Sequence, residues 1–266
     1  MGQPVEIGQQ AVDFALRLAD AARATLAEGE GRALDVEVKP DHSFVTRMDR
    51  TIEARLRAMI EAEYPDHGII GEEDGTLRAG ASHVWVIDPI DGTAPFITGI
   101  PVWGTLIALA IDGVPRLGII DTPAAGARWL GVAGRATLLN GRPCRTRACP
   151  GLAQAVMTNS NRDYLSAEEL PALDRLRVMT ANRVYGGACL NYGRLAEGRS
   201  DLAMDAGQKV FDFAPFPPII EGAGGVISDW AGRPLTLDSG GRILAAGGRA
   251  CHDAALAEIA DLGLAT

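Results

Sequence analysis

Two aspartates, Asp88 and Asp91, follow an apolar run that begins at Trp85. Pro89 lies between them and Gly92 comes directly after, and both residue types favour a turn. On a straight strand, residues three apart point to opposite faces, so the two carboxylates converge only if the backbone bends between them. Converging carboxylates at a strand end are typical of a cation site. Taken alone, the Asp-Pro-x-Asp-Gly pattern is also typical of a simple turn or a structural calcium loop.

Three further carboxylates are candidate ligands of the same cation, namely Glu72, Glu73 and Asp212. The two glutamates follow a short apolar strand over 68–71, and Asp212 lies inside an apolar segment. Oxygen ligands without His or Cys suit a hard cation, so the sequence predicts Mg2+ or Mn2+ rather than zinc. By itself, however, a Glu-Glu pair at the end of a strand is more often a solvated turn.

A short helix is expected directly after the aspartate pair. The order Thr93-Ala94-Pro95 predicts its start, with Thr93 as the cap and Pro95 in the first turn. Such a helix would direct free backbone N–H groups toward the carboxylates, where an anion can bind.

The elements around these motifs alternate between helix and strand in the first half of the chain. Apolar residues at helical spacing predict helices over about 4–28 and about 45–63, with a short strand over 34–38 between them. Three β-rich runs over 104–111, 114–120 and 127–132 predict an antiparallel meander. Asp112-Gly113 is a typical hairpin turn between the first two runs.

A boundary is predicted near 142–151, where Pro, Gly, Arg and Cys interrupt the pattern. We therefore expect two halves, 1–145 and 146–266, in one compact catalytic unit. The second half alternates regularly, which predicts an α/β fold class with helix and sheet layers. The expected elements are strand 155–158, helix 167–175, strand 183–185, helix 189–196, strand 201–204, helix 211–222, strands 225–228 and 242–245, and helix 251–262.

The composition excludes several classes of protein. The 25 basic and 34 acidic residues give a net charge of -9 without a basic run, so nucleic acid is not an expected partner. The four cysteines lack the spacing of a zinc or redox motif, and we expect reduced thiols. No apolar run approaches the roughly 20 residues of a membrane span. The N-terminus lacks a signal-peptide pattern, so we expect a cytoplasmic protein without a membrane partner.

Together, the acidic segments resemble the inositol monophosphatase superfamily of metal-dependent phosphatases. The matching motifs are Gly71-Glu72-Glu73, 88–93, 211–214 and 221–225, and the resemblance extends from the Lys39 loop to Ala246. Within the superfamily, the chain is most similar to the histidinol-phosphatase type, through the segments 41–46, 96–99, 104–109, 129–131, 145–149 and 221–230. The resemblance implies a layered α-β-α-β-α sugar-phosphatase fold, with an antiparallel N-terminal sheet and a mixed C-terminal sheet.

The resemblance also implies the ligands of two Mg2+ ions, with Mn2+ as a substitute. Glu72, Asp88 and the backbone carbonyl of Ile90 would hold one ion, and Asp88, Asp91 and Asp212 the second. In the family, two such cations bind the phosphate, activate a water molecule and stabilise the leaving alkoxide of an in-line displacement.

The same resemblance assigns roles around the attacking water. Glu72 and the Thr93 hydroxyl would orient it, and Asp49 would polarise Thr93. The alternative is that Thr93 only caps the helix. The backbone N–H groups of Gly92 and Thr93 would bind phosphate oxygens.

Two residues have weaker assignments. Lys39 lies on the loop that closes over the metal ions in relatives, and the alternative is a solvated loop lysine. Glu73 would bind a third cation through water, or would only add negative charge.

The substrate-binding residues implied by the resemblance are Asp91, Gly92, Thr93, Ala188, Asp205 and Asp212. Asp205 matches a family acid that contacts a hydroxyl or an amine of the substrate. The alternative is an ordinary carboxylate at a strand end.

Three departures from the family pattern concern the alcohol part of the substrate. Ala94 stands where relatives often carry Arg, Lys or Thr, and Ala188 stands where histidinol phosphatases tend to carry Asp. Where relatives read Asp-x-Ala-Ala in the helix, this chain has Pro215 as the last residue, with Pro217 and Pro218 in the first turns. We expect a phosphomonoesterase acting on a small phosphorylated metabolite, with histidinol phosphate as the first candidate. Inositol 1-phosphate or another sugar or cyclitol phosphate is the alternative.

Other possibilities are less consistent with the sequence. A 3'-phosphoadenosine substrate is disfavoured because the chain has no evident basic cluster for a second phosphate. A non-catalytic regulator that binds a metal or ligand would require a broken metal site, yet every expected ligand is present. Relatives are commonly homodimers, and we expect the apolar meander over 104–132 to offer a surface for pairing.

Overall fold

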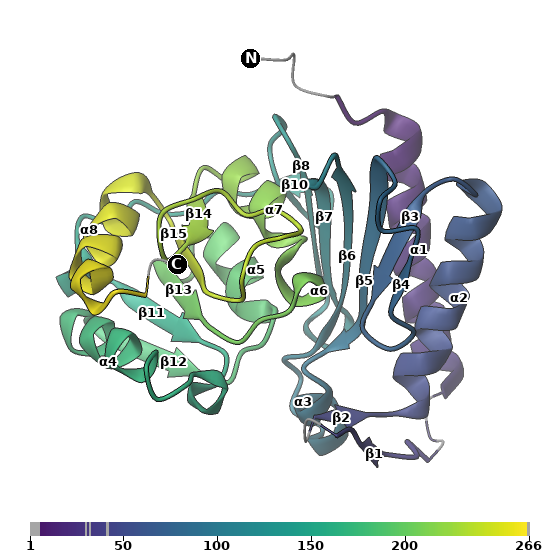
Figure 1. Ribbon diagram of the computed structural model, residues 1–266, viewed down its shortest axis with the longest axis horizontal. Coiled ribbons are helices and arrows are strands. Elements are labelled where there is room, and N and C mark those ends of the chain that lie inside the picture. The colour runs from purple at the N-terminus through teal and green to yellow at the C-terminus, as the bar shows by residue number, and fades with distance from the viewer. Residues whose placement is uncertain (1–5, 30, 32, 41–42, 265–266) are drawn as a thin grey trace.

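A computed structural model of the chain describes residues 6–29, 31, 33–40 and 43–264. Two large sheets run through it, one of eight strands and one of five. Helices cover both outer faces and fill the space between the sheets, which gives an α-β-α-β-α order of layers (Figure 1). This is the layered fold that the sequence resemblance predicted.

The eight-stranded sheet has the order β10-β9-β8-β7-β6-β5-β3-β4. Its strands are β3 (Gly68–Gly71), β4 (Thr76–Leu77), β5 (His83–Asp91), β6 (Gly104–Ile111), β7 (Val114–Thr122), β8 (Ala127–Val132), β9 (Leu138–Leu139) and β10 (Arg142–Pro143). The predicted meander is confirmed as β6, β7 and β8. Asp112 and Gly113 both have positive φ, +49° and +76°, as a tight hairpin turn requires.

One pair in this sheet is parallel, which corrects the expectation of an entirely antiparallel sheet. β3 pairs antiparallel with β4 at the sheet edge and parallel with β5 on its other side. The chain reverses direction once between β3 and β4 and again between β4 and β5. Two reversals leave β5 running in the direction of β3, and β5 pairs with β3 on the side away from β4.

Helices α1 (Gln9–Gly29) and α2 (Arg47–Glu63) cover the outer face of the eight-stranded sheet. Their apolar faces form one core with Trp85, Ile87 and neighbouring strand residues. Thr46 caps α2 with its side chain, and the helix ends before Tyr64-Pro65 as expected. Pro4, predicted near the start of α1, lies outside the described residues.

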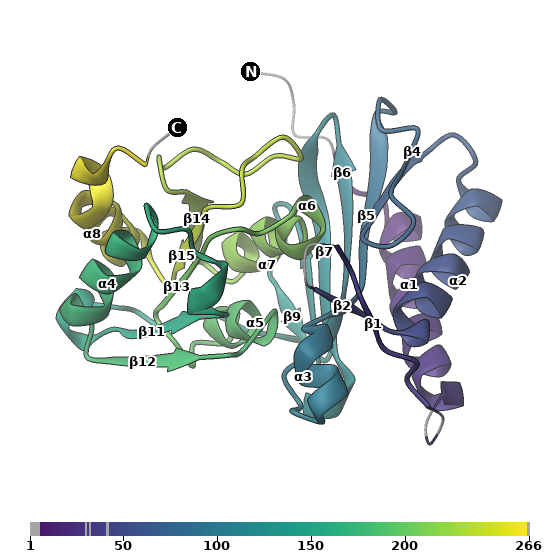
Figure 2. The ribbon, with the colours of Figure 1, turned by 60° about the horizontal axis from the view of Figure 1, so that its bottom comes forward.

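A two-stranded hairpin precedes α2 and lies beside the short helix α3 (Thr93–Thr98), as Figure 2 shows. Its strands are β1 (Glu37–Val38) and β2 (Phe44–Val45). Lys39 follows β1 directly. Asp41 and His42 of the predicted turn lie outside the described residues.

The five-stranded sheet has the order β12-β11-β13-β15-β14 and mixes parallel and antiparallel pairs, as expected. Its strands are β11 (Val156–Asn159), β12 (Asn182–Tyr185), β13 (Leu202–Asp205), β14 (Val226–Asp229) and β15 (Ile243–Ala246). Helices α4 (Leu170–Met179) and α8 (Arg249–Ile259) pack on its outer face. Four short 3-10 helices complete the described elements: Pro123–Ala125, Leu152–Gln154, Arg162–Tyr164 and Ala260–Leu262.

Helices α5 (Leu190–Ala196), α6 (Val210–Phe213) and α7 (Phe216–Gly222) lie between the two sheets. The single helix expected over 211–222 is therefore wrong. Pro215 lacks the backbone N–H that a continuous helix needs, and the chain breaks there into α6 and α7. The break leaves α6 as one turn that carries Asp212.

The meander does not offer the pairing surface that we expected. Every residue of β6 is buried, and β7 is buried apart from Val114 and Arg116. Helices cover one face of these strands and the inner layer covers the other, so the apolar residues belong to the core. The division of the chain near residue 145 stays a prediction.

Candidate active site

The end of β5 brings Asp88 and Asp91 to the same face of the sheet. Val84 and Val86 face the inner layer, and Asp88 continues their alternation. In a regular strand, Asp91 would then face α1 and α2. The register shifts between the two aspartates, because Asp88 pairs with Leu106 and Asp91 with Gly104. Three steps on β5 match two on β6, and this bulge confirms the predicted bend.

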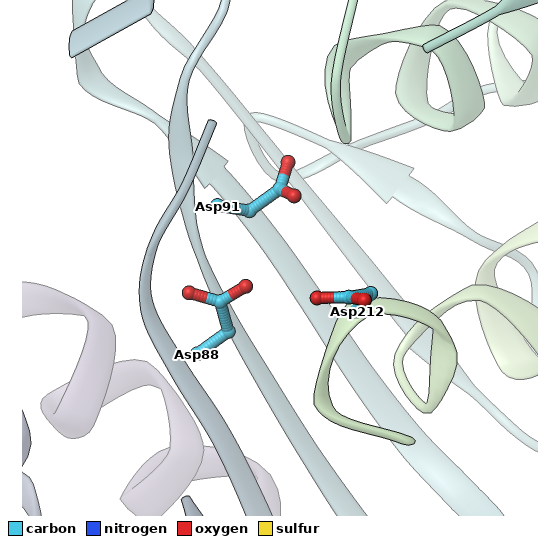
Figure 3. A group of neighbouring side chains, drawn as sticks. All are labelled: Asp88, Asp91 and Asp212. Atoms are coloured by element: carbon cyan, nitrogen blue, oxygen red, sulfur yellow. The ribbon is translucent and has the colours of Figure 1, made fainter. Parts of the chain in front are cut away.

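Asp212 on α6 completes the cluster from the C-terminal half of the chain. One carboxylate oxygen of each of Asp88, Asp91 and Asp212 lies within 4.8 Å of the others. Figure 3 shows the three side chains pointing toward one another from the strand and from the helix. Backbone N–H groups hold two of them, since Asp91 Oδ2 accepts from Cys189 (2.5 Å) and Asp212 Oδ2 accepts from Lys209 (2.6 Å).

The cluster has a strong excess of negative charge. Burial raises the pKa of Asp88 well above its usual range, and the nearby charges of Glu72, Asp91 and Asp212 raise it further. Burial and the charge of Asp91 likewise raise the pKa of Asp212. Asp88 Oδ1 is buried and has no hydrogen-bond partner. A buried carboxylate oxygen without a donor is costly, so the site is built for a positive ligand.

A hard divalent cation fits this donor set. The three aspartates offer only oxygen, and Asp88 Oδ1 has no hydrogen-bond partner among the described residues. Mg2+ and Mn2+ both accept such ligands, whereas a structural zinc site would normally use Cys or His.

Glu72 and Glu73 lie beside the cluster and are bound by Lys39. The Lys39 ammonium donates to Glu72 Oε1 (2.9 Å) and to Glu73 Oε1 (2.7 Å). Burial raises the pKa of Glu72, and Lys39 opposes that rise. Burial also raises the pKa of Glu73, to about 7. The charge of Glu72 raises the pKa of Asp88, so Glu72 lies near the three aspartates although it is not one of the close group.

Thr93 is placed differently from the expected helix cap. The N-cap of α3 is Gly92, at φ +83°, and no side chain caps this helix. Thr93 is the first helical residue, and its hydroxyl donates to the Ile90 carbonyl (3.1 Å) and approaches Asp49 Oδ1 (3.4 Å). The reading of Thr93 as a cap is therefore wrong, and its contact with Asp49 is the one that the family resemblance implied.

A cavity of about 670 Å³ opens beside the aspartates, between the two halves of the chain. Of the predicted substrate residues, Asp91, Gly92 and Ala188 line it, while Thr93, Asp205 and Asp212 do not. Gly92 and Ala188 approach closely, because a Cβ on Gly92 would lie 3.1 Å from that of Ala188.

Asp205 lies beneath this cavity, where protein donors occupy its carboxylate. It is 1% exposed and accepts hydrogen bonds from Asn159 Nδ2 (3.0 Å), Tyr192 OH (2.9 Å), and the amide (2.7 Å) and hydroxyl (3.1 Å) of Ser160. Ser160 and Tyr192 line the cavity themselves. The carboxylate therefore contacts the residues of the cavity wall, and its predicted contact with substrate stays a prediction.

Sequence reasoning missed most of the cavity wall. The additional lining residues include Ser160, Asn161, Arg162, Tyr164, Arg177, Tyr185, Tyr192 and Gln208. They come from loops, from α4 and from β12 and α5, and no common motif links them. Only the packing of these segments brings them together.

The chain matches known proteins over nearly its whole length. Residues 8–263 match the model of the inositol monophosphatase family. A bifunctional phosphatase of Arabidopsis thaliana, IMPL2, chloroplastic, is 40% identical over 90% of this chain and 72% of that protein. A histidinol-phosphatase of Chlorobaculum parvum is 35% identical over 88% of this chain and 91% of that protein.

A solved structure shows the same architecture. The inositol monophosphatase from Zymomonas mobilis superposes with a TM-score of 0.87 at 40% identity, covering 95% of this chain and 98% of that chain. Fold, motifs and relatives agree. The chain therefore belongs to the inositol monophosphatase family and is a phosphatase.

Proposed function

We propose that this phosphatase hydrolyses a small phosphorylated alcohol with the help of Mg2+, and that histidinol phosphate is its substrate. The observation that carries the proposal is the close group of Asp88, which is buried, with the half-buried Asp91 and Asp212, none of which forms an ion pair among the described residues, beside a cavity large enough for such a molecule. The relatives named histidinol-phosphatase support the choice of substrate.

In this proposal, Asp88, Asp91 and Asp212 hold the metal together with Glu72 and the Ile90 carbonyl, and Mn2+ substitutes for Mg2+. The bound cations neutralise the phosphate and the developing charge on the leaving oxygen. Two or three ions would occupy the site, with Glu73 as a ligand of the most weakly bound ion. Lys39 would release Glu72 to the metal, because the ammonium group and the cation are positive charges that compete for the same carboxylate.

The attacking water is oriented by Thr93 and Glu72, and Asp49 polarises the Thr93 hydroxyl. The Thr93 hydroxyl donates its own hydrogen to Ile90 or Asp49, which leaves its oxygen free to accept one from water. Asp49 is fixed by Thr46, whose amide and hydroxyl donate to Asp49 Oδ2 at 2.8 Å and 2.5 Å. The amides of Gly92 and Thr93 bind phosphate oxygens.

A phosphate-release assay with purified protein tests the substrate. Histidinol phosphate, inositol 1-phosphate and glycerol 2-phosphate are compared at the same saturating concentration of Mg2+. We expect the highest kcat/KM with histidinol phosphate, and loss of activity with EDTA that Mg2+ or Mn2+ restores. A higher kcat/KM with inositol 1-phosphate would overturn the substrate assignment while leaving the phosphatase activity intact.

Inositol 1-phosphate is the second candidate. Its hydroxyl groups suit the Ser160, Asn161 and Gln208 side chains that line the cavity. The solved relative with 40% identity is an inositol monophosphatase. A sugar phosphate would fit for the same reason.

We also propose a cytoplasmic homodimer. The four cysteines are free, which is typical of a reducing compartment. None of the helices in the described part of the chain is long and apolar enough to cross a membrane.

For the homodimer, Val184 and Tyr185 are exposed on the edge strand β12 and are candidates for the pairing surface. Size-exclusion chromatography with light scattering measures the mass, and a monomer would contradict the proposal.

A further inference from the structure

Glu53 on α2 is a buried charge that none of the predicted catalytic roles includes. Its side chain is fully buried, and its carboxylate accepts hydrogen bonds from the backbone amides of Glu73 (Oε2, 2.8 Å) and Asp74 (Oε1, 3.0 Å). Both donors belong to the turn that follows β3. Glu53 therefore binds, from helix α2, the turn that carries Glu72 and Glu73.

Arg57 completes the attachment one helical turn later. Its Nε donates to Glu53 Oε1 (2.8 Å), and its Nη2 donates to the carbonyl of Gly75. The Gly71 amide also bonds to the Gly75 carbonyl (3.0 Å), which closes the turn on itself. Glu53 and Arg57 thus hold the middle and the end of one five-residue turn.

Gly71 shows how closely the helix and the turn approach. A Cβ at this position would lie 2.0 Å from Glu53 Oε1 and 2.5 Å from its Cδ. Glycine provides the room that the carboxylate needs, so the position of the turn depends on the position of Glu53. The residue after Gly71 is Glu72, whose carboxylate adjoins Asp88.

The face of α2 that carries Glu53 also carries Asp49, which contacts Thr93. Asp49 lies four residues before Glu53 and approaches the Thr93 hydroxyl. Residues four apart share a helix face. One helix therefore positions both Asp49, which contacts Thr93, and Glu53, which binds the Glu72 turn.

We propose that Glu53, supported by Arg57, is a positioning residue that holds Glu72 in place for cation binding. It touches neither substrate nor cation and acts only through the backbone of the turn. The inference rests on the proposed function, because Glu72 is there a ligand of the metal. Buried carboxylates that accept two backbone amides fix a loop more firmly than surface contacts do, since each lost bond leaves a buried group unpaired.

Glu53→Gln is the decisive variant. Glutamine keeps the shape but turns an N–H2 group toward a donor. Either one bond (from Glu73) or two bonds (from Asp74 and Arg57) are lost, depending on which way the amide lies. Mn2+ binding is measured by titration calorimetry, alongside the Mg2+ concentration for half-maximal activity. We expect both to weaken ~10-fold, the order of magnitude seen when the hydrogen-bond partner of a metal ligand is removed. At saturating Mg2+, kcat should change far less and KM should stay unchanged.

Glu61→Gln is the matched control, because Glu61 is exposed two turns further along α2. It should bind Mn2+ like the wild type. A purely structural role of Glu53 would lower the unfolding temperature without changing Mn2+ affinity in the folded protein, and that result would overturn the proposal.

Arg57→Lys provides a second measurement if Glu53→Gln does not fold. Lysine keeps the charge but cannot bond Glu53 and the Gly75 carbonyl together, and we expect ~3-fold weaker Mn2+ binding, less than removal of a direct partner causes. Unchanged affinity would contradict the inference. Failure of the proposed function looks different, since the wild-type protein itself would then neither bind Mn2+ nor release phosphate.

Discussion

Asp121 and Asp88 are both buried on the eight-stranded sheet, but their surroundings are opposite. Asp121 on β7 accepts two hydrogen bonds from Arg23 (2.7 and 2.6 Å) and two from Arg128 (2.9 and 3.3 Å). Asp88 on β5 has an oxygen without any donor, and its nearest charged neighbours are carboxylates. The first acid is neutralised inside the fold, and the second is not.

This contrast separates a stabilising charge from a functional one. Asp121 links α1, β7 and β8 through two guanidinium groups, so its charge contributes to holding the layers together. The Asp88 cluster does not stabilise the fold by itself, because its members repel one another. The Lys39 ammonium binds Glu72 and Glu73 rather than the aspartates, and no basic side chain forms an ion pair with Asp88 among the described residues. In the proposed function, a bound cation supplies the positive charge that Asp88 lacks.

Replacing an acid of the cluster should cost activity and spare the fold. Asp91→Asn keeps an oxygen that can accept from Cys189 but removes a negative charge from the cation site. We expect kcat to fall by at least ~10²–10³-fold, the scale of losing one preorganised charge-stabilising group. The circular dichroism spectrum should match the wild type, and the rise in unfolding temperature on adding Mg2+ should shrink. Activity near the wild-type level would refute the metal assignment.

Replacing the neutralised acid should do the reverse. Asp121→Asn leaves two guanidinium groups without their carboxylate, and breaking such a buried pair costs about 3 kcal/mol of unfolding free energy. Urea denaturation measures the loss, and kcat/KM at 25 °C should remain that of the folded wild type. Asp20→Asn is the control, because Asp20 pairs with Arg128 at an exposed position and should cost less than about 1 kcal/mol. An equal loss of unfolding free energy in Asp121→Asn and Asp20→Asn would mean that the buried pairs of Asp121 do not stabilise the fold.

Asp205 is an intermediate case, buried and hydrogen-bonded but without a basic partner. Burial raises its pKa to about 7, although bonds from Ser160 and Tyr192 act in the other direction. Because the folded pKa is above the unfolded one, the folded state binds the extra proton, and stability falls as pH rises through about 7. Between pH 6 and pH 7 the wild type should lose about 1 kcal/mol relative to Asp205→Asn.

Urea denaturation of both proteins at several pH values checks this difference. The variant should show the flatter profile, since asparagine does not titrate. Identical profiles would mean that Asp205 is ionised throughout and that its hydrogen bonds outweigh its burial.

Local features of the chain were predictable because they depend on neighbours in sequence. The turn at Asp112-Gly113 needs positive φ, which Gly supplies and Asp tolerates, and the strands around it alternate with the pleat. The bend between Asp88 and Asp91 follows from Pro89 and from the face that each aspartate must reach. The break at Pro215 was also encoded locally, but the apolar residues around it concealed it.

Contacts between distant segments were not predictable in the same way. The parallel pairing of β3 with β5 depends on which edge β4 occupies. The buried meander depends on helices that pack on it from both sides. The contact of the Thr93 hydroxyl with Asp49 depends on how α2 packs beside α3.

The sequence by itself determined the chemistry of this protein: the acidic motifs, their order and the bend that presents two of them. The tertiary structure alone decided which carboxylates are neutralised, since arginines reach Asp121 from α1 and β8 while no cationic side chain pairs with Asp88 among the described residues. The tertiary structure also decided that Glu53 binds the backbone of the Glu72 turn. The physical reason is that charge compensation acts over a few ångströms in space, and packing sets those distances whatever the separation along the chain.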